Sequence, residues 1–593
     1  MPDHRLLSSF AVIMIASMLG LAGPAPADPA SELAKLCDQY WQGELEADPT
    51  TATSVGDKRY DDRLADITPA GIERGRKRLE SVLARASAIG ETALTPADRL
   101  TRSALILETT NGIDQGSCHF EDWVVDPLGG PQVELMSLVD YTSIDSPKDG
   151  MNFVQRCRAM GPFVDAHVEN LRSGLKLGRV ASHDAVVKVI AELDALDAKP
   201  VEQWALLEPL KAKHAGWPAA DREAFLRGVP AAVRESVKPA LMRYRDFLKQ
   251  DVLPAARPQD KAGLSFLPGG KECYTKRIRI ETSLDRTPED LHQLGLEQVA
   301  LNRAAVSELG MKVFGTGDVA EIQRRLRSDP AMHFRTGAEI ESKATEALAR
   351  AKAAIPAWFD ILPKGRCDVK VMGMHEAPNS TIAYYRQGTP DGSRPGHYMI
   401  NTYLPETRPR YEAEALAFHE SIPGHHLQIA IAQELTGIPE FRKHQGVTAF
   451  VEGWGLYSER LAEEMGLYSN DTDRLGMLSY DAWRACRLVV DTGMHAMGWT
   501  RQQAIDYMIE NTALAENNIV NEVDRYLTWP GQALAYKCGQ LEILKLRDEA
   551  RQRLGDRFDI KQFHNVVLRN GAVALPVLRE QVEAWVAAQV EAK

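Results

Sequence analysis

Cysteine is scarce in this chain and is never clustered. Seven cysteines are spread over the 593 residues: Cys37, Cys118, Cys157, Cys273, Cys367, Cys486 and Cys538. Cysteine-ligated metal sites need closely spaced pairs, so these side chains are poor candidates for metal ligands. The odd number also leaves at least one cysteine unpaired in a monomer.

Positive charge and long apolar runs are lacking as well. Lysine and arginine number 70 against 82 aspartates and glutamates, a net charge of −12. This balance argues against nucleic acid or an anionic membrane as a partner. Beyond residue 27 no segment is apolar enough to span a bilayer. The composition, 44% hydrophobic and 26% charged, is that of a globular chain, and the length predicts two packed halves rather than one small core.

The first 27 residues have the parts of a secretory signal peptide. A short basic start at His4 and Arg5 precedes an apolar run over residues 6–21, and Ala25-Pro26-Ala27 offers a small-residue cleavage site. Serines interrupt the apolar run, which is shorter than a comfortable membrane span. No cysteine stands at the cleavage point, which argues against a lipoprotein. We therefore expect a periplasmic or secreted mature protein that leaves the membrane after cleavage.

Helical patterns fill residues 28–260. Apolar residues recur at three-and-four spacing, with charged outer faces, in ranges 31–41, 69–89, 96–110, 146–177 and 183–196. Thr95 and Ser146, each followed by proline, mark helix starts. No catalytic cluster is present, so we expect this N-terminal helical region to form one wall of a cleft.

The residue composition and pattern change near residue 260. A glycine- and proline-containing stretch from Ala262 leads into an alternating polar and apolar segment, Thr275–Thr282. We place a boundary here, with residues 261–593 as the second region. Thr287-Pro288 then opens a long helix with a capping pattern. Strand-like runs at 368–372, 382–385 and 397–402 are separated by turn signals.

The residues that indicate chemistry begin with His419-Glu420-Ser421-Ile422-Pro423-Gly424-His425-His426. In the usual zinc-hydrolase pattern, H-E-x-x-H, two histidines four apart share one helix face. Here the second position is Pro423, which has no imidazole and no amide to donate. If the helix loops Pro423 and Gly424 out as a bulge, His425 recovers the required spacing.

His426 is the alternative second ligand. It lies seven residues after His419, which is about two turns or roughly 10 Å along a straight helix. Ligands that are each about 2 Å from one zinc ion cannot be so far apart. Either histidine therefore requires a distorted helix, and His425 requires the smaller distortion.

A carboxylate on the next predicted helix strengthens the interpretation. Residues 447–457 form a mostly apolar, helix-like run that contains one acidic side chain, Glu452. Buried carboxylates are rare unless they are paired or bound to metal. The loop after His425 is long enough for an antiparallel return. The sequence therefore predicts Zn²⁺, one per chain, bound by His419, His425 and Glu452.

These motifs carry a family resemblance. The segments H-E-S-I-P-G-H-H-L-Q, V-E-G-W-G-L-Y-S-E and R-Y-L-T-W-P-G-Q-A-L-A-Y-K-C-G resemble the bacterial family known as domain of unknown function 885. The resemblance extends over most of the mature chain. It implies kinship with zinc peptidases that take two histidines from one helix and a glutamate from the next, and more distantly with thimet and angiotensin-converting peptidases. The implied fold is mainly α, with a small β-sheet beside the metal helix and a deep cleft.

The resemblance also implies roles around the metal. In similar peptidases the edge strand of the small sheet pairs with an extended substrate. Residues 397–402, with Tyr398 and Asn401, stand at that point in the sequence, although they could equally form a buttressing hairpin. Short peptides are the implied substrates.

Residues further along the chain are candidates for the remaining roles. His495 is a candidate for stabilising the oxyanion, although it could form a structural ion pair with Asp491 four residues earlier. Arg525 could hold a substrate carboxylate, and Tyr526 or Tyr536 could donate to the tetrahedral oxygen. The sequence alone does not choose among these residues.

The predicted reaction is metal-assisted hydrolysis of an amide bond. Glu420 is the general base that takes a proton from the attacking water and returns it to the leaving amine. Zinc suits two imidazoles and one carboxylate, although manganese or cobalt could substitute. The alternative is a binding or scaffold protein in which a metal staples two helices. Such a site usually has four protein ligands and cysteine, and Glu420 would be superfluous in it.

Overall fold

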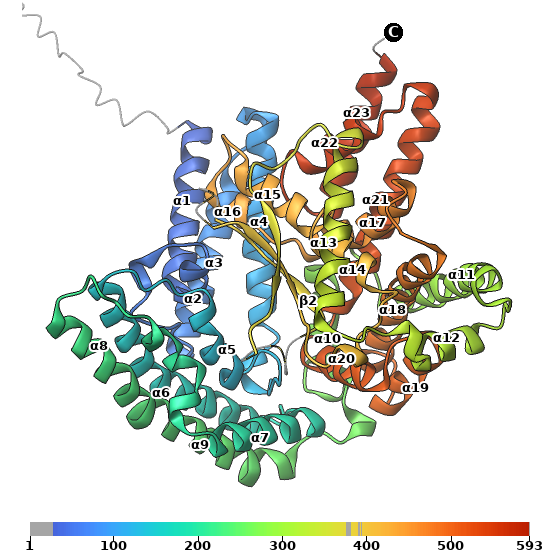
Figure 1. Cartoon of the computed structure of the whole chain (residues 1–593). Helices are drawn as coiled ribbons and strands as arrows, with labels where there is room; N and C mark the ends of the chain where they lie inside the picture. The colour runs from blue at the N-terminus through green and yellow to red at the C-terminus, as the bar shows by residue number, and fades with distance from the viewer. Residues whose placement is uncertain (1–27, 375–376, 378–380, 390–391, 393, 592–593) are drawn as a thin grey trace, which may run out of the picture.

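The computed structural model describes residues 28–374, 377, 381–389, 392 and 394–591. The expected signal peptide lies outside these described residues. The fold is mainly helical with one small three-stranded sheet, as the sequence predicts. Figure 1 shows most of helices α1 to α9 along the left and lower sides, α4 in the middle, and most of the later helices at the right. Within the described residues no helix combines the length and apolar character that a membrane span needs.

Within residues 28–260 the structure has nine α-helices: α1 (Pro29–Ala47), α2 (Pro49–Ser54), α3 (Pro69–Ala88), α4 (Pro96–Gly116), α5 (Pro131–Ser137), α6 (Pro147–Lys176), α7 (His183–Ala198), α8 (Ala219–Ala232) and α9 (Lys238–Phe247). Their starts follow the predicted chemistry. The Thr95 side chain accepts from the Asp98 amide at the start of α4, and Ser146 forms a reciprocal capping box with Asp149 at the start of α6. The helical interpretation of this region is confirmed.

The second region contributes α10 (Gly270–Thr282), α11 (Pro288–Phe314), α12 (Val319–Ser328), α13 (Gly337–Ala354), α14 (Ala413–Glu420), α15 (His425–Glu434), α16 (Glu440–His444), α17 (Thr448–Glu464), α18 (Asp471–His495), α19 (Arg501–Asn511), α20 (Glu516–Thr528), α21 (Gln532–Leu554), α22 (Ile560–Leu568) and α23 (Leu575–Glu591). Thr287 caps α11 as expected, because its side chain accepts from the Asp290 amide. The apolar run around Glu452 is helical, as predicted, and lies in α17.

The alternating segment Thr275–Thr282 is part of helix α10. Buried residues in α10 recur as pairs four positions apart, from Tyr274 through Ile278 to Thr282. This spacing buries one face of a helix against α4 and α21. Alternation over so few residues is compatible with a strand or a helix, and packing against α4 and α21 decides in favour of the helix.

Each region has a hydrophobic core, and the two regions also meet in a third. One core consists of residues between Val125 and Val252, and a larger one extends from Ala262 to Val586. A smaller cluster joins residues of both regions around a disulfide between Cys118 and Cys273. The other five cysteines are free and buried.

The sheet contains β1 (Cys367–Val371), β2 (Ala383–Arg386) and β3 (Gly396–Ile400) in the order β1-β3-β2. Strand β3 runs parallel to β1 and antiparallel to β2. The three strand predictions are therefore confirmed, but the expectation that residues 397–402 form an edge strand is wrong. β3 lies between the two strands that precede it in the sequence. Local sequence patterns predict strands but not their order in a sheet. The two edges belong to β1 and β2.

The central position of β3 removes its backbone from any substrate. Tyr398 is buried within this strand. The Asn401 amide donates to the carbonyls of Ala377 and Thr381, and its side-chain oxygen accepts from the Tyr403 amide. Both residues thus support the sheet, which favours the buttressing interpretation of this segment.

A cavity of about 330 Å³ lies between α11, α17, α18 and α21, and its lining includes Asn302, Asp481 and Lys537. It does not include the histidines of the candidate site. The expected deep cleft at that site stays a prediction.

Helices α17 and α21 cross at two glycines. A Cβ on Gly453 would lie 2.4 Å from the Gly539 Cα, and a Cβ on Gly539 would lie 1.8 Å from the Ala449 carbonyl oxygen. Real side chains do not tolerate such contacts, so the backbones approach this closely only with glycine at both positions. The crossing fixes α17, which carries Glu452, against α21.

We predict that Gly539→Ala lowers the free energy of unfolding by about 3 kcal/mol or more, because its methyl group meets backbone that cannot move aside. Gly75→Ala in α3 is the matched control, since a Cβ there meets no atom within 4 Å. The control should gain roughly 0.5–1 kcal/mol from helix propensity. Denaturant titration measures both, and equal stability of the two variants would contradict the close crossing.

Candidate metal centre

The motif from His419 to His425 belongs to two helices and not to one bulged helix. Helix α14 ends at Glu420 and α15 begins at His425, because Pro423 cannot donate the amide hydrogen bond that a continuous helix requires. A Cβ on Gly424 would lie 1.8 Å from the His419 carbonyl oxygen, so this turn requires glycine. The indole of Trp454 on α17 donates to the Pro423 carbonyl at 2.9 Å. The break, and not a bulge, brings the two histidines together.

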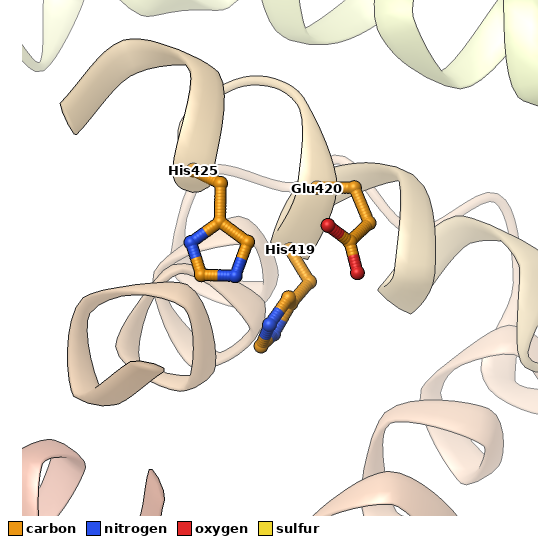
Figure 2. A group of neighbouring side chains, drawn as sticks. All are labelled: His419, Glu420 and His425. Atoms are coloured by element: carbon orange, nitrogen blue, oxygen red, sulfur yellow. The ribbon is translucent and has the colours of Figure 1, made fainter. Parts of the chain in front are cut away.

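Three ligand atoms converge at this break. His419 Nε2 and His425 Nε2 lie 3.6 and 3.3 Å from Oε2 of Glu452. Two ligands of one tetrahedral zinc ion, each about 2.0–2.1 Å from it, are about 3.4 Å apart. The separations therefore fit atoms that share one ion. Figure 2 shows the side chains of His419, Glu420 and His425 projecting to the same side of the two helices.

A second carboxylate, which the sequence interpretation missed, orients His419. The Nδ1 atom of His419 lies 2.8 Å from Oε1 of Glu459. A proton on Nδ1 leaves Nε2 unprotonated and facing the metal position, which is the usual arrangement of a ligating histidine. Glu459 lies seven residues after Glu452 on α17, so the two carboxylates share one helix face. This seven-residue spacing is the sequence feature from which Glu459 could have been predicted as a partner of the site.

Glycine on the same face of α17 makes room for the imidazole. A Cβ on Gly455 would lie 2.7 Å from Cε1 and 2.8 Å from Nε2 of His419. The ring therefore packs directly on the α17 backbone between the two carboxylates. The motif Glu452-Gly453-Trp454-Gly455 thus supplies a ligand, a close helix crossing, a bond to the turn, and space for the ring.

His426 is directed away from the metal position. Its Nδ1 lies 2.9 Å from the Tyr385 hydroxyl and its Nε2 lies 3.1 Å from the Gly365 carbonyl. Both ring nitrogens are thus used by the neighbouring sheet and loop. Burial lowers the pKa of His426 to about 4, so its imidazole is neutral. Of the two candidates, the structure brings only His425 to Glu452.

Glu420 lies beside the three convergent residues. Its Oε2 accepts a hydrogen bond from the Tyr385 amide of β2 at 2.9 Å. Ligand atoms of His419, Glu420 and His425 lie within 4.8 Å of one another. The bond to β2 fixes the carboxylate next to the metal position, where a general base would act.

The group is electrostatically suited to a divalent cation. Burial acts to lower the pKa of His419, but the side chains of Glu452 and Glu459 outweigh it and raise the pKa to about 9. Burial acts to raise the pKa of Glu452, but His419 and His425 hold it well below its usual range. Three carboxylates surround two imidazoles, so their combined charge is negative. Oxygen and nitrogen donors of this kind suit zinc.

Among the outlying candidates, Tyr536 lies nearest to this group. Its ring stacks on the His419 ring with centroids 6.5 Å apart, and Gln532 donates to its hydroxyl at 3.4 Å. Burial raises the pKa of Tyr536, and the charge of Glu452 adds to this rise. Its phenol therefore keeps a proton that it can donate.

Tyr526 and Arg525 are occupied by neighbours. The Tyr526 hydroxyl accepts from Trp483 at 2.9 Å and from Arg487 at 2.7 Å. Arg525 donates to Glu522 at 3.0 Å and to Gln532 at 2.8 Å. Neither residue is brought to the metal position as a free donor.

His495 is a structural residue of helix α18. The Leu264 amide donates to its Nδ1 at 3.1 Å, and its Nε2 lies 3.0 Å from the Tyr526 carbonyl. Asp491 accepts from Tyr274 at 2.6 Å and from the Gly531 amide at 3.1 Å. The two therefore do not form the ion pair considered from the sequence, and His495 has no nitrogen left for an oxyanion.

Comparison with known proteins places this fold in a family. The model of bacterial proteins of unknown function DUF885 matches residues 49–582. The chain belongs to this family. A crystal structure of a candidate lipoprotein from Colwellia psychrerythraea aligns with this DUF885 protein at a TM-score of 0.89 and 27% identity, over 95% of this chain and 100% of that one.

A second structure, a candidate lipoprotein of unknown function from Shewanella oneidensis, aligns at a TM-score of 0.69 and 17% identity over 92% of this chain and 99% of that one. This likeness shows the fold alone. Comparison with curated proteins gives no match to this DUF885 protein.

We predict that substitutions distinguish the zinc ligands from the residues around them by their effect on zinc affinity. His425→Asn should weaken zinc binding by more than the roughly 10–100-fold that loss of an outer hydrogen bond costs, whereas Glu459→Gln should fall within that range. His426→Asn, the matched control, should leave the zinc affinity unchanged because its nitrogens face β2 and Gly365. Competition with a chromophoric chelator measures all three. Zinc loss with His426→Asn and not with His425→Asn would reverse the assignment.

Proposed function

We propose that this protein is a zinc-dependent peptidase that hydrolyses short peptides. The observation that carries the proposal is the convergence of His419 Nε2 and His425 Nε2 on Glu452 Oε2, at 3.6 and 3.3 Å, with the Glu420 carboxylate beside them. Three protein ligands leave one position of a tetrahedral zinc ion open, as in catalytic sites. Bound zinc would polarise the scissile carbonyl and lower the pKa of water.

Glu420 is the general base of the proposed reaction. Its Oε2 is held by the Tyr385 amide, and the carboxylate lies beside His419 and His425. The carboxylate takes a proton from the attacking water and later passes it to the leaving nitrogen. A structural metal ion that only linked α14, α15 and α17 would not require a general base beside it.

Tyr536 is the proposed donor to the carbonyl oxygen as it becomes negative. Its ring packs against the His419 ring, and its pKa is raised, so the hydroxyl is protonated at neutral pH. A fixed donor near the developing charge lowers the barrier because it needs no reorganisation. Tyr526, whose hydroxyl already has two donors, is assigned a supporting role.

Strand β2, in place of β3, is the proposed edge strand that pairs with the substrate backbone. It pairs with β3 on one side only, and its Tyr385 amide points away from β3 to Glu420. A peptide lying in extended form along this edge would pass the metal position. Backbone pairing of this kind holds peptides of varied sequence.

The proposal includes export to the periplasm or beyond, on the strength of the signal-like residues 1–27. The two similar solved structures are of candidate lipoproteins, which agrees with an extracytoplasmic setting.

We predict that Glu420→Gln keeps one zinc ion per chain and loses nearly all turnover, by a factor on the order of 10²–10⁴. Elemental analysis gives the metal content, and mass spectrometry of a peptide-mixture digest before and after chelation gives the activity. Zinc should restore cleavage in the chelated wild type. Full activity of a zinc-loaded Glu420→Gln variant would remove the base from the mechanism, and a metal-loaded wild type that cleaves no peptide would favour a binding protein.

We predict that Tyr536→Phe lowers kcat by about 10²–10³-fold, the usual effect of removing one oxyanion donor, with little change in KM. Tyr526→Phe is the matched control on the neighbouring helix α20. It should act mainly on stability, because its hydroxyl links Trp483 to Arg487. Steady-state kinetics on one peptide decides between the two tyrosines, and a larger fall in kcat for Tyr526→Phe would exchange their roles.

A further inference from the structure

Two buried arginines beside Tyr536 lack partners for part of their guanidinium groups. Arg484 is 4% exposed, and its Nε and Nη1 have no hydrogen-bond partner among the described residues. No hydrogen bond or ion pair joins its side chain to any part of the chain that the structure describes. A buried cation without a counterion is costly, so this site favours an anion from outside the chain.

Aromatic rings hold the Arg484 guanidinium in place. Its Cζ lies 4.5 Å from the Tyr480 ring centroid, 4.2 Å from that of Trp483 and 5.9 Å from that of Tyr536. Contacts with ring faces offset part of the cost of burying the charge. They leave the N–H groups, which lie in the guanidinium plane, available to an acceptor.

Arg487, one turn further along α18, has partners for only part of its guanidinium group. Its Nε donates to Tyr526 and its Nη2 to Glu522 at 3.0 Å. Its Nη1 is buried without a partner in the described chain. The Cζ of Arg487 lies 4.4 Å from the Tyr536 ring centroid. Both arginines therefore contact the ring that packs against His419.

Positive charge is in excess at this point. Glu522 serves both Arg487 and Arg525, so one carboxylate faces two guanidinium groups. Glu412 is an acidic side chain that acts on Arg484, but it hydrogen bonds to Ser479 and forms no ion pair in the described chain. Burial raises the pKa of Glu412 to about 7, so it is only partly ionised near neutrality.

We propose that Arg484 and Arg487 form an anion site that holds the free C-terminal carboxylate of the substrate. This inference rests on the proposed peptidase function and makes it more specific: the enzyme is an exopeptidase that acts at C-termini. A guanidinium fork matches a carboxylate with two parallel hydrogen bonds. Arg525, considered for this role from the sequence, is already bound to Glu522 and Gln532.

The spacing limits how much of the substrate follows the cleaved bond. The Tyr536 ring lies 6.5 Å from the His419 ring and 4.4 Å from Arg487 Cζ, which places that carbon no more than about 11 Å from the ring of the metal ligand. An extended residue covers roughly 3.3–3.6 Å. No more than about three residues therefore fit between the metal position and the carboxylate, so the released product is an amino acid or a very short peptide.

The test compares two peptides that differ only at the C-terminus, one with a free carboxylate and one with an amide. The zinc-loaded wild type should cleave the free acid with a kcat/KM about 10–100-fold higher, the range that hydrogen bonds to a charged group provide. Arg484→Gln should bring this ratio close to one. Arg484→Lys keeps the charge but loses the fork and should give an intermediate ratio.

Arg257→Gln is the matched control for burial of an unpaired cation. Arg257 is 5% exposed, its Nε and Nη1 also lack partners in the described chain, and its Cζ lies over the Trp123 ring at 5.4 Å. It belongs neither to the metal group nor to the contacts of Tyr536. Its substitution should leave the acid-to-amide ratio as in the wild type. Zinc content and thermal unfolding confirm that each variant is folded.

A binding measurement separates this inference from the proposed function. Succinate, a small dicarboxylate, should bind the wild type in calorimetry and bind Arg484→Gln at least about 10-fold more weakly. Cleavage of both peptides at equal rates would overturn the carboxylate site and leave the peptidase intact. Absence of cleavage with succinate binding that depends on Arg484 would overturn the peptidase and keep the anion site. Succinate binding that Arg484→Gln does not change would overturn the anion site.

Discussion

The packing of the His419 imidazole on the backbone of α17 is the contact on which the rest of the site depends. Gly455 lets the ring lie directly on the helix, and in that position one nitrogen faces Glu459 while the other faces Glu452. One helix face thus determines both the tautomer of a ligand and the place of a second ligand. The turn that carries His425 is tied to the same helix through Trp454.

Local sequence chemistry predicted those features that depend on neighbours in the chain. Thr95 and Ser146 cap their helices as expected because capping involves only the next three residues. Glu452 stood out because an acidic residue in an apolar helix needs a partner. The choice of His425 over His426 followed from the short reach of metal–ligand bonds.

Features that depend on distant segments were not predictable in this way. The central place of β3 depends on strand order, and the helical state of Thr275–Thr282 depends on packing against α4 and α21. Pro423 was correctly identified as an obstacle, but the chain breaks there instead of bulging, and Trp454 of another helix hydrogen bonds to the turn. Tyr536 and Arg484 are more than 50 residues apart and come together only because α18 and α21 lie side by side. Relatives at 27% and 17% identity share this fold, but function depends on the groups placed on a fold rather than on the fold itself.

The disulfide between Cys118 and Cys273 joins the two regions in their shared core. It closes a loop with a sequence separation of 155 residues, and that loop contains the core between Val125 and Val252. Such bonds persist in oxidising compartments and are rare in the cytosol. The disulfide therefore adds a covalent link between the loop after α4 and helix α10, and α4 and α10 also pack against each other directly. A chain held under reducing conditions would keep the packing contacts between the two regions but lose this cross-link, so its unfolded state would be less constrained.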